Sequence, residues 1–186
     1  MKRPDHGRKS IATTFSHHVM SLSPVALRAE IAALLPRLRR FGRSVTHHRE
    51  DADDLVQIAV ERALKHLDQW QDGTRLDSWL FRIMKNAWID EVRARGRRDE
   101  VLAPEEAGEH VGYSETGSRD IRLSIEKAMA RLPEEQRMAV SLVLVEGLPY
   151  KDAAEVLDIP IGTLTSRLAR GRDALQAMLG DGDITP

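Results

Sequence analysis

Hydrophobic residues recur every three or four positions in the first half of the chain, which is the period of an amphipathic α-helix. The pattern predicts a first helix that begins at Pro24 and closes at Gly42, before the polar stretch HHRED. A second helix is predicted from Asp51, with Asp51 as its cap, and a third from Thr74, where Asp77 completes a variant of the capping box. The residues expected on the inner face of the third helix are Trp79, Leu80, Ile83, Ala87, Trp88 and Val92.

The helical period returns after Asp120 and predicts four further elements. The apolar positions that lead to Pro133 are Ile121, Ile125, Ala128, Met129 and Leu132. Pro133 fits the first turn of the next helix, which ends at the stretch EGLPY. A short helix over residues 151–157, a tight break at DIPIG and a longer helix over residues 163–179 follow, with Thr163 as the cap of the last.

These elements predict an all-α protein with two small helical domains, residues 24–98 and 120–180, joined by a flexible acidic linker at residues 99–119. Residues 1–23 show no amphipathic period and are predicted to form a flexible tail, and residues 181–186 form a C-terminal tail. Aromatic residues make up only 4% of the chain, which favours helices packed on helices over a sheet.

The last two predicted helices form a helix-turn-helix pattern, in which the second helix lies in the major groove of DNA. One arc of that helix carries Leu164, Leu168, Gly171, Leu175 and Met178, and the opposite arc carries Thr165, Ser166, Ala169, Arg170 and Asp173. Arginine grips phosphate or guanine with two hydrogen bonds at once, so Arg167, Arg170 and Arg172 are candidate DNA contacts. The alternative is that these arginines only solvate an exposed helix.

The formal net charge of −1 conceals a division of charge along the chain. Residues 82–98 carry six basic and two acidic side chains, whereas residues 99–120 carry seven acidic and one basic. Separate surfaces for a polyanion and for another partner are therefore expected. The chain contains no cysteine, which excludes disulfides, thiolate metal sites and a cysteine nucleophile. No apolar run is long enough to span a membrane, so we expect a cytoplasmic protein without membrane insertion.

Two blocks of the sequence resemble bacterial RNA polymerase sigma factors of the extracytoplasmic-function (ECF) type, which keep only regions 2 and 4 of the sigma-70 family. The first block is DADDLVQIAVERALKHLDQW with LDSWLFRIMKNAWIDEVRARGRR, and the second is LPEEQRMAVSLVLVEGLPYKDAAEVLDIPIGTLTSRLARGRDAL. The resemblance implies a region 2 helical bundle over residues 24–98 and a region 4 helix-turn-helix over residues 120–180. It implies an alternative sigma factor for a stress or envelope response, which is not an enzyme and needs no cofactor.

The resemblance also assigns roles to residues of the first domain. Asp53, Asp54 and Gln57 would dock on the clamp helices of the polymerase β′ subunit. Asn86 would contact a base extruded from the −10 strand, at a cost of a few kcal/mol of unstacking that polar contacts and the basic surface must offset. The residues implied in −10 DNA binding are Trp70, Arg75, Arg82, Lys85, Asn86, Arg93 and Arg97.

In the second domain the resemblance implies −35 recognition by Thr165, Ser166, Ala169 and Arg170, with Arg167 or Arg172 on phosphate. Other implied partners are the β flap of core RNA polymerase, promoter DNA, and an anti-sigma factor that covers the binding faces. The acidic linker would thread through polymerase channels, or else it is an ordinary solvated connector. The sequence departs from the family at Thr165, where a basic residue is common, at Ala169, where a larger one is common, and at Ile58, where an acid is common.

Other interpretations stay open at this point. The second domain also fits a helix-turn-helix regulator that binds duplex DNA without polymerase, and the helical domains fit a protein that sequesters a partner. The pairs His17–His18 and His47–His48 suggest metal ligation, but adjacent histidines do not easily face one ion, so no metal or catalytic site is expected. Trp79 and Trp88 suggest base stacking, although their apolar neighbours favour core packing.

Overall fold

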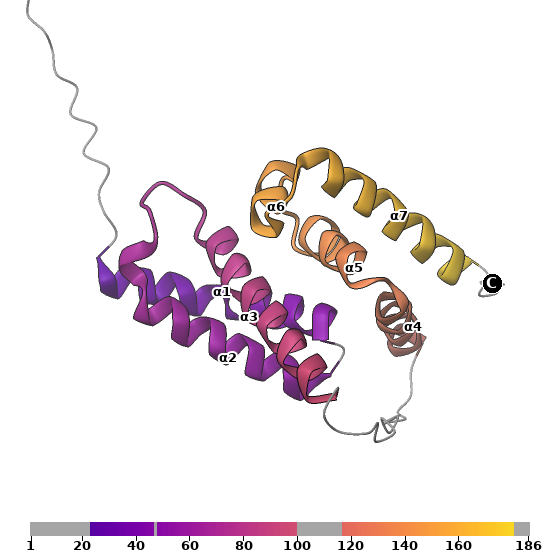
Figure 1. Ribbon diagram of the computed structural model, residues 1–186, viewed down its shortest axis with the longest axis horizontal. Helices are drawn as coiled ribbons and strands as arrows, with labels where there is room; N and C mark the ends of the chain where they lie inside the picture. The colour runs from indigo at the N-terminus through magenta and orange to yellow at the C-terminus, as the bar shows by residue number, and fades with distance from the viewer. Residues whose placement is uncertain (1–22, 47, 100–116, 181–186) are drawn as a thin grey trace, which may run out of the picture.

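The computed structural model of the chain describes residues 23–46, 48–99 and 117–180, and these residues form helices without strands (Figure 1). The first domain contains α1 (Pro24–Thr46), α2 (Arg49–Lys65), the 3-10 turn η1 (Leu67–Gln69) and α3 (Leu76–Asp99). The second contains α4 (Gly117–Arg131), α5 (Glu134–Val140), the π-helical turn η2 (Ser141–Val145), α6 (Tyr150–Leu157) and α7 (Ile161–Gly180). The predicted all-α class with two helical domains is confirmed. The predicted tails and nearly all of the predicted linker lie outside the described residues.

The first domain packs α1, α2 and α3 around a core of large apolar side chains. Leu38, Phe41, Leu80 and Phe81 have no exposed surface. The rings of Phe41 and Phe81 meet edge to face with their centroids 5.1 Å apart, an arrangement that suits the charge distribution of aromatic rings. This core fixes the position of α3 relative to the other two helices.

The predicted end of the first helix at Gly42 is wrong. α1 continues to Thr46, and Gly42 is buried where α1 approaches α2. A Cβ atom on Gly42 would lie 3.2 Å from the carbonyl oxygen of Ala52, which is tighter than ordinary van der Waals contact. Glycine therefore serves close helix packing at this position and not helix termination.

Asp51 is not the cap that the sequence suggested. α2 begins at Arg49 with His48 as its N-cap residue, and Asp51 lies within the first turn. The Asp51 carboxylate accepts a hydrogen bond of 3.0 Å from Arg95 of α3, which ties the start of α2 to the end of α3. That hydrogen bond is the main reason why the pKa of Asp51 is lowered.

The two threonine caps are also wrong. The Thr74 hydroxyl donates to the Gln71 carbonyl at 2.6 Å, and α3 begins at Leu76. α7 begins at Ile161, so Thr163 already lies inside the helix. In the first turn of α3 the Asp77 side chain accepts the backbone N–H of Ser78 at 2.8 Å. In the first turn of α7 the N–H groups of Thr163 and Leu164 donate to the Pro160 carbonyl, at 2.9 Å and 3.1 Å.

The second domain places a helix-turn-helix, α6 and α7, on top of α5 and η2. Asp158 makes the turn between α6 and α7 with a left-handed backbone (φ 57°). The predicted inner arc of α7 is confirmed: Leu164 and Leu168 are buried, and Gly171 is buried against α5. A Cβ atom at Gly171 would come within 2.8 Å of Val140 Cγ2, so only glycine permits this approach.

One inward prediction fails in α4. Ile121 and Ile125 are 65% and 45% exposed, whereas Ala128 and Met129 are buried. α4 makes its contacts with α7 and α1, and its buried residues belong to its C-terminal half. The helical period correctly predicted a helix at this position. It did not show that only the C-terminal half of the helix packs against other helices.

The two domains pack against each other along α3 and α6, with α5 and η2 against α1 (Figure 1). Their buried apolar residues form one continuous cluster, which includes Phe41, Phe81, Met84 and Trp88 from the first domain and Met138, Leu142, Ala154 and Val156 from the second. α3 consequently has two covered faces, one toward α1 and α2 and one toward α6.

Candidate nucleic-acid interface

The outer face of α7 is open to solvent and carries the predicted −35 residues. Thr165, Ser166, Ala169 and Arg170 are exposed, on the arc opposite the buried Leu164 and Leu168. The hydroxyls of Thr165 and Ser166 donate to helix carbonyls, at 2.9 Å and 3.0 Å. Both hydroxyl oxygens retain lone pairs that can accept a hydrogen bond from outside the helix. This face can therefore enter a DNA groove without rearrangement of the helix.

The other two arginines of α7 differ in their surroundings. Arg167 is half-buried and forms an ion pair of 2.8 Å with Glu135 of α5. Arg172 is exposed on the next turn. A phosphate contact is accordingly easier for Arg172 than for Arg167, because Arg167 would have to exchange its carboxylate partner for the phosphate.

The predicted −10 residues of α3 border α6. Arg82, Lys85 and Asn86 line a pocket of about 320 Å³ together with Glu155 and Asp158 of the second domain. Arg82 and Asn86 are exposed, whereas Lys85 keeps only 8% of its surface exposed. Burial lowers the pKa of Lys85, and the neighbouring Asp158 carboxylate opposes part of that shift.

Arg93 and Arg97 follow on the C-terminal half of α3. Arg93 is exposed, and the side chain of Arg97 lies outside the described part of the structure. Arg95 lies between them and is held by Asp51 and Glu91, each at 3.0 Å, which raises its pKa. The Arg95 guanidinium also stands 5.9 Å from the centre of the Trp88 ring, so this arginine is committed to structure.

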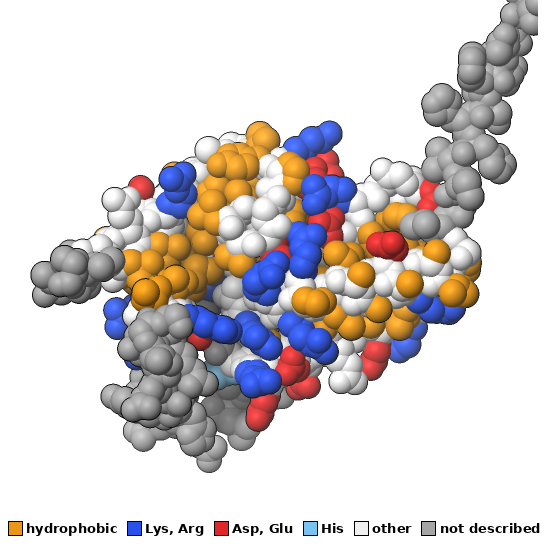
Figure 2. All heavy atoms as spheres, turned by 180° about the vertical axis from the view of Figure 1, so that it is seen from behind, with side chains coloured by type: hydrophobic (Ala, Val, Ile, Leu, Met, Phe, Trp, Pro, Cys, Tyr) orange, Lys and Arg blue, Asp and Glu red, His pale blue; other side chains and the backbone are white. Residues whose placement is uncertain are grey.

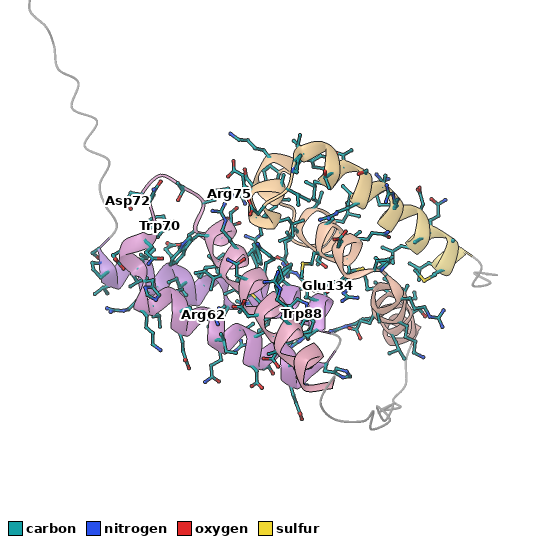
Figure 3. The ribbon with its side chains drawn as sticks, in the orientation of Figure 1. Arg62, Trp70, Asp72, Arg75, Trp88 and Glu134 are labelled. Carbon is teal, nitrogen blue, oxygen red and sulfur yellow. The ribbon has the colours of Figure 1, made fainter. Side chains whose placement is uncertain are left out.

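The loop between η1 and α3 brings Arg75 to the edge of the domain interface, whereas Trp70 lies at the other end of the loop, away from the second domain (Figure 3). Trp70 is half-buried against the core, and its buried indole N–H has no partner among the described residues. Arg75 is paired at 2.7 Å with Asp77 and at 3.5 Å with Asp152 of α6. Trp79 is half-buried and Trp88 is buried, in agreement with the core role expected for both.

Asp77 connects this loop to α1. Its carboxylate accepts hydrogen bonds of 2.7 Å from both Arg37 and Arg75, and it also accepts the backbone N–H of Ser78 at 2.8 Å. Burial acts to raise the pKa of Asp77, but the hydrogen bonds from Arg75 and Arg37 outweigh it and hold the pKa at about 2. These charged hydrogen bonds tie the start of α3 to Arg37 of α1.

We expect Asp77→Asn to lower the free energy of unfolding by about 2 kcal/mol at neutral pH, because the pKa falls from 3.8 to about 2 on folding. A depressed carboxyl pKa gives stability that is complete above about pH 4 and is lost as the pH falls toward 2. Urea unfolding of both proteins at neutral pH and near pH 3 measures this. A difference between the two proteins that does not shrink with acid would contradict the assignment.

The predicted polymerase-binding residues lie on the outer face of α2. Asp53, Asp54 and Gln57 are all exposed. The Gln57 amide donates to Glu61 at 3.0 Å, and Asp53 stands 3.9 Å from the Arg39 guanidinium. Both contacts are between exposed side chains and are weak enough to be exchanged for a protein partner.

Sequence reasoning missed the charged residues that join the domains: Arg37, Arg40, Glu146, Asp152, Glu155 and Asp158. The carboxylate of Glu146 is fully buried between Arg37 and Arg40 of α1. The available signal was an acid in the apolar stretch LVLVEGLP, three positions before a proline. This signal did not identify the partners of Glu146, because they lie in the other domain and are known only once the two domains are placed together.

The fold and the exposed face of α7 define a two-domain helix-turn-helix protein of the DNA-binding class. The family model of Sigma-70 region 2 matches residues 31–98, and that of Sigma-70, region 4 matches residues 122–175. The chain belongs to the sigma-70 family and is a sigma factor of the ECF type.

The relatives agree with this assignment. The ECF RNA polymerase sigma factor EcfG of Rhodopseudomonas palustris (strain TIE-1) is 37% identical over 157 residues, which cover 83% of this chain and 85% of the relative. The ECF sigma factor SigM of Mycobacterium tuberculosis (strain H37Rv) is 35% identical over 77% of this chain and 72% of its own length. The sigma factor RpoE of Bartonella quintana, solved in complex with the anti-sigma factor NepR, superposes with a TM-score of 0.70 at 32% identity, over 84% of this chain and 98% of that one.

Sigma factors of this family direct RNA polymerase to promoters and carry out no chemistry of their own. The predicted alternative-sigma function, and the prediction that the chain is not an enzyme, are confirmed by the family. Within the described residues no three acidic or histidine side chains gather as a metal site, and His17, His18 and His47 lie outside them. None of the described helices combines the length and apolar character of a membrane span.

Proposed function

We propose that this chain binds core RNA polymerase through the outer face of α2 and reads promoters with α3 and α7. Asp53, Asp54 and Gln57 contact the clamp helices of the β′ subunit, and the second domain contacts the β flap. Residues 24–98 and 120–180 act as the two recognition units, joined by residues 99–119, in the cytoplasm where polymerase works. The observation that carries the proposal is the exposed outer face of α7 on a chain that matches both sigma regions.

At the −35 element, Thr165, Ser166, Ala169 and Arg170 face the bases, and Arg172 holds phosphate, joined by Arg167 once it leaves Glu135. At the −10 element, Asn86 contacts the extruded base. The strand backbone runs along Arg82, Lys85, Arg93 and Arg97, with Trp70 and Arg75 at the wall of the base pocket. Arginine and lysine suit this task because phosphate contacts supply most of the affinity for a strand.

We also propose an anti-sigma partner of the NepR kind. The support is the RpoE of Bartonella quintana, which was solved in complex with NepR. RpoE is 32% identical to this chain, and the match covers 98% of RpoE and 84% of this chain. The partner would cover the faces that bind polymerase and DNA and would hold the protein inactive until a stress signal removes it. Recovery of the protein from unstressed cells with polymerase alone would contradict this proposal.

The test of the proposed function is run-off transcription with purified core polymerase and a pool of genomic promoter fragments. We expect the native chain to direct new initiation, and Arg170→Ala to reduce it about tenfold, since a good arginine–guanine contact contributes roughly 1 to 3 kcal/mol. Arg122→Ala is the matched control, because Arg122 is an exposed arginine of the same domain, on α4. Equal activity of the two variants would contradict the proposed contact between Arg170 and the bases of the −35 element.

A further inference from the structure

The helix α7 carries three arginines, and one of them is paired within its own domain. Arg170 and Arg172 are exposed to solvent. Arg167 keeps only 23% of its side chain exposed, and its Nη2 atom stands 2.8 Å from the carboxylate of Glu135 on α5. A phosphate that approaches α7 therefore meets two unpaired arginines and a third that already has an anionic partner.

The contact between Glu135 and Arg167 follows from the close packing of α5 on α7. A Cβ atom at Gly171 would lie 2.8 Å from Val140 Cγ2 and 3.5 Å from Gln136 Cβ, so the glycine is what permits this approach. Arg167 lies one turn before Gly171 on α7, and Glu135 directly precedes Gln136 on α5. The same approach thus brings the Glu135 carboxylate within reach of the arginine.

Glu135 is the more exposed member of the pair, with 68% of its side chain in contact with solvent. An ion pair open to water on one side is weak and can be exchanged for another anion. Carboxylate and phosphate both offer oxygen acceptors to a guanidinium group. Glu135 and a DNA phosphate consequently compete for Arg167.

Opposite charges also lie side by side elsewhere on the surface. Seen from behind, lysine and arginine side chains gather in a band across the middle of the molecule, with acidic side chains among them (Figure 2). The full chain has a formal net charge of −1. Its attraction to a DNA duplex therefore depends on local groups of unpaired arginines and lysines, and pairing one of them has a measurable effect.

We propose that Glu135 is a specificity-determining residue, which keeps Arg167 from the phosphates of duplex DNA that lacks the −35 element. Binding to such DNA depends on phosphate contacts alone, so it is weaker by the one contact that Glu135 prevents. At the −35 element, base contacts by Arg170 fix α7 in one position, and the phosphate held beside Arg167 replaces Glu135. The inference rests on the −35 role proposed for α7.

The first measurement is the affinity of the full chain for a fluorescein-labelled duplex of mixed sequence, at roughly 50 to 200 mM salt. Glu135→Gln should bind about fivefold more tightly than the native chain, because Arg167 is released. Its logarithmic salt dependence should steepen by about 0.9, the value for one further phosphate contact.

Glu126→Gln is the matched control for this measurement. It removes the same charge from an exposed ion pair with Arg122 on α4 of the same domain. A general electrostatic gain would appear in both variants, whereas the steeper salt dependence should appear in Glu135→Gln alone. Equal affinities and equal salt dependence of the two variants would overturn the proposal.

A double variant shows whether Glu135 acts through Arg167. With Arg167→Ala in place, Glu135→Gln and Glu126→Gln should change the duplex affinity equally, since the arginine that Glu135 holds is absent. A larger gain from Glu135→Gln in that background would contradict the proposal. Misfolding cannot imitate the expected result, because loss of the fold weakens binding and the expected change is a tighter one.

Specificity is measured by run-off transcription with core polymerase and an excess of the mixed-sequence duplex as competitor. We expect Glu135→Gln to lose initiation at about fivefold less competitor than the native chain, in proportion to its tighter binding of that duplex. Glu126→Gln should behave as the native chain, and equal sensitivity of the two variants would overturn the proposal.

Arg170→Ala separates this inference from the proposed function. If Arg170→Ala binds duplex and directs initiation like the native chain, the −35 role of α7 is wrong. If Arg170→Ala weakens both while Glu135→Gln matches Glu126→Gln, only the role of Glu135 is wrong. The duplex titration requires no polymerase, so it tests Glu135 even where the chain directs no initiation.

Discussion

Replacing Phe81 with alanine should lower the free energy of unfolding by about 4 kcal/mol, the largest stability effect we expect from a single substitution. The Phe81 side chain has no exposed surface, and its ring meets Phe41 edge to face and lies 5.5 Å below the Arg37 guanidinium. Removal leaves a cavity that rigid helices on both sides cannot close. Chemical denaturation followed by circular dichroism measures the loss.

Two further substitutions calibrate this result. Phe81→Leu retains most of the buried volume and should cost clearly less than alanine. Val25→Ala truncates a side chain that is 74% exposed and should change stability by less than about 0.5 kcal/mol. A loss below about 1 kcal/mol for Phe81→Ala would mean that the site collapses around the smaller residue and that α3 is not held as described.

Replacing Asn86 with alanine should reduce initiation from duplex promoters by about tenfold to a hundredfold, the largest functional effect we expect. Asn86 is exposed on α3, and its amide both donates and accepts hydrogen bonds, as recognition of an extruded base requires. The side chain is exposed and alanine favours a helix, so the variant should fold without loss of stability. Run-off transcription and permanganate probing of the open strand measure the defect.

A promoter that is already open at the −10 element shows whether the Asn86→Ala defect arises in strand opening or in a later step. Mismatched bases at the −10 element remove most of the cost of unpairing, so the effect of Asn86→Ala should shrink on such a template. Gln176→Ala, which truncates an exposed amide on α7, is the control and should behave as the native chain. An undiminished defect on the open template would assign Asn86 to a step after strand opening.

The sequence predicted the helices and the face of α7 because each depends on local periodicity. Leu164, Leu168 and Gly171 face inward as expected, and Arg170 faces outward. In α3 the same reasoning found Leu80 but overlooked Phe81, which is buried at 0% exposure. A helix covered on two faces does not show the single apolar stripe that periodicity detects.

The placement of charged side chains was less predictable. Glu146 is fully buried, whereas Glu126 lies on an open helix surface. The apolar neighbours of Glu146 in the sequence did not show that Arg37 and Arg40 would enclose its carboxylate. The same limit applies to Lys85, whose predicted DNA contact is covered by α6 in this arrangement. Burial of these groups depends on how the two domains dock, and docking is decided by residues far apart in the chain.

That docking has a consequence for the order of folding. The contact between Arg37 and Glu146 joins residues separated by 109 positions. Closing so long a loop costs chain entropy before any contact compensates for it, so locally connected helices form first and distant pairs last. During synthesis the first domain is complete before Glu146 has been made. Each newly made molecule therefore passes through an interval in which the surface around Asn86 is uncovered, and polymerase or an inhibitor can reach it before the chain closes on itself.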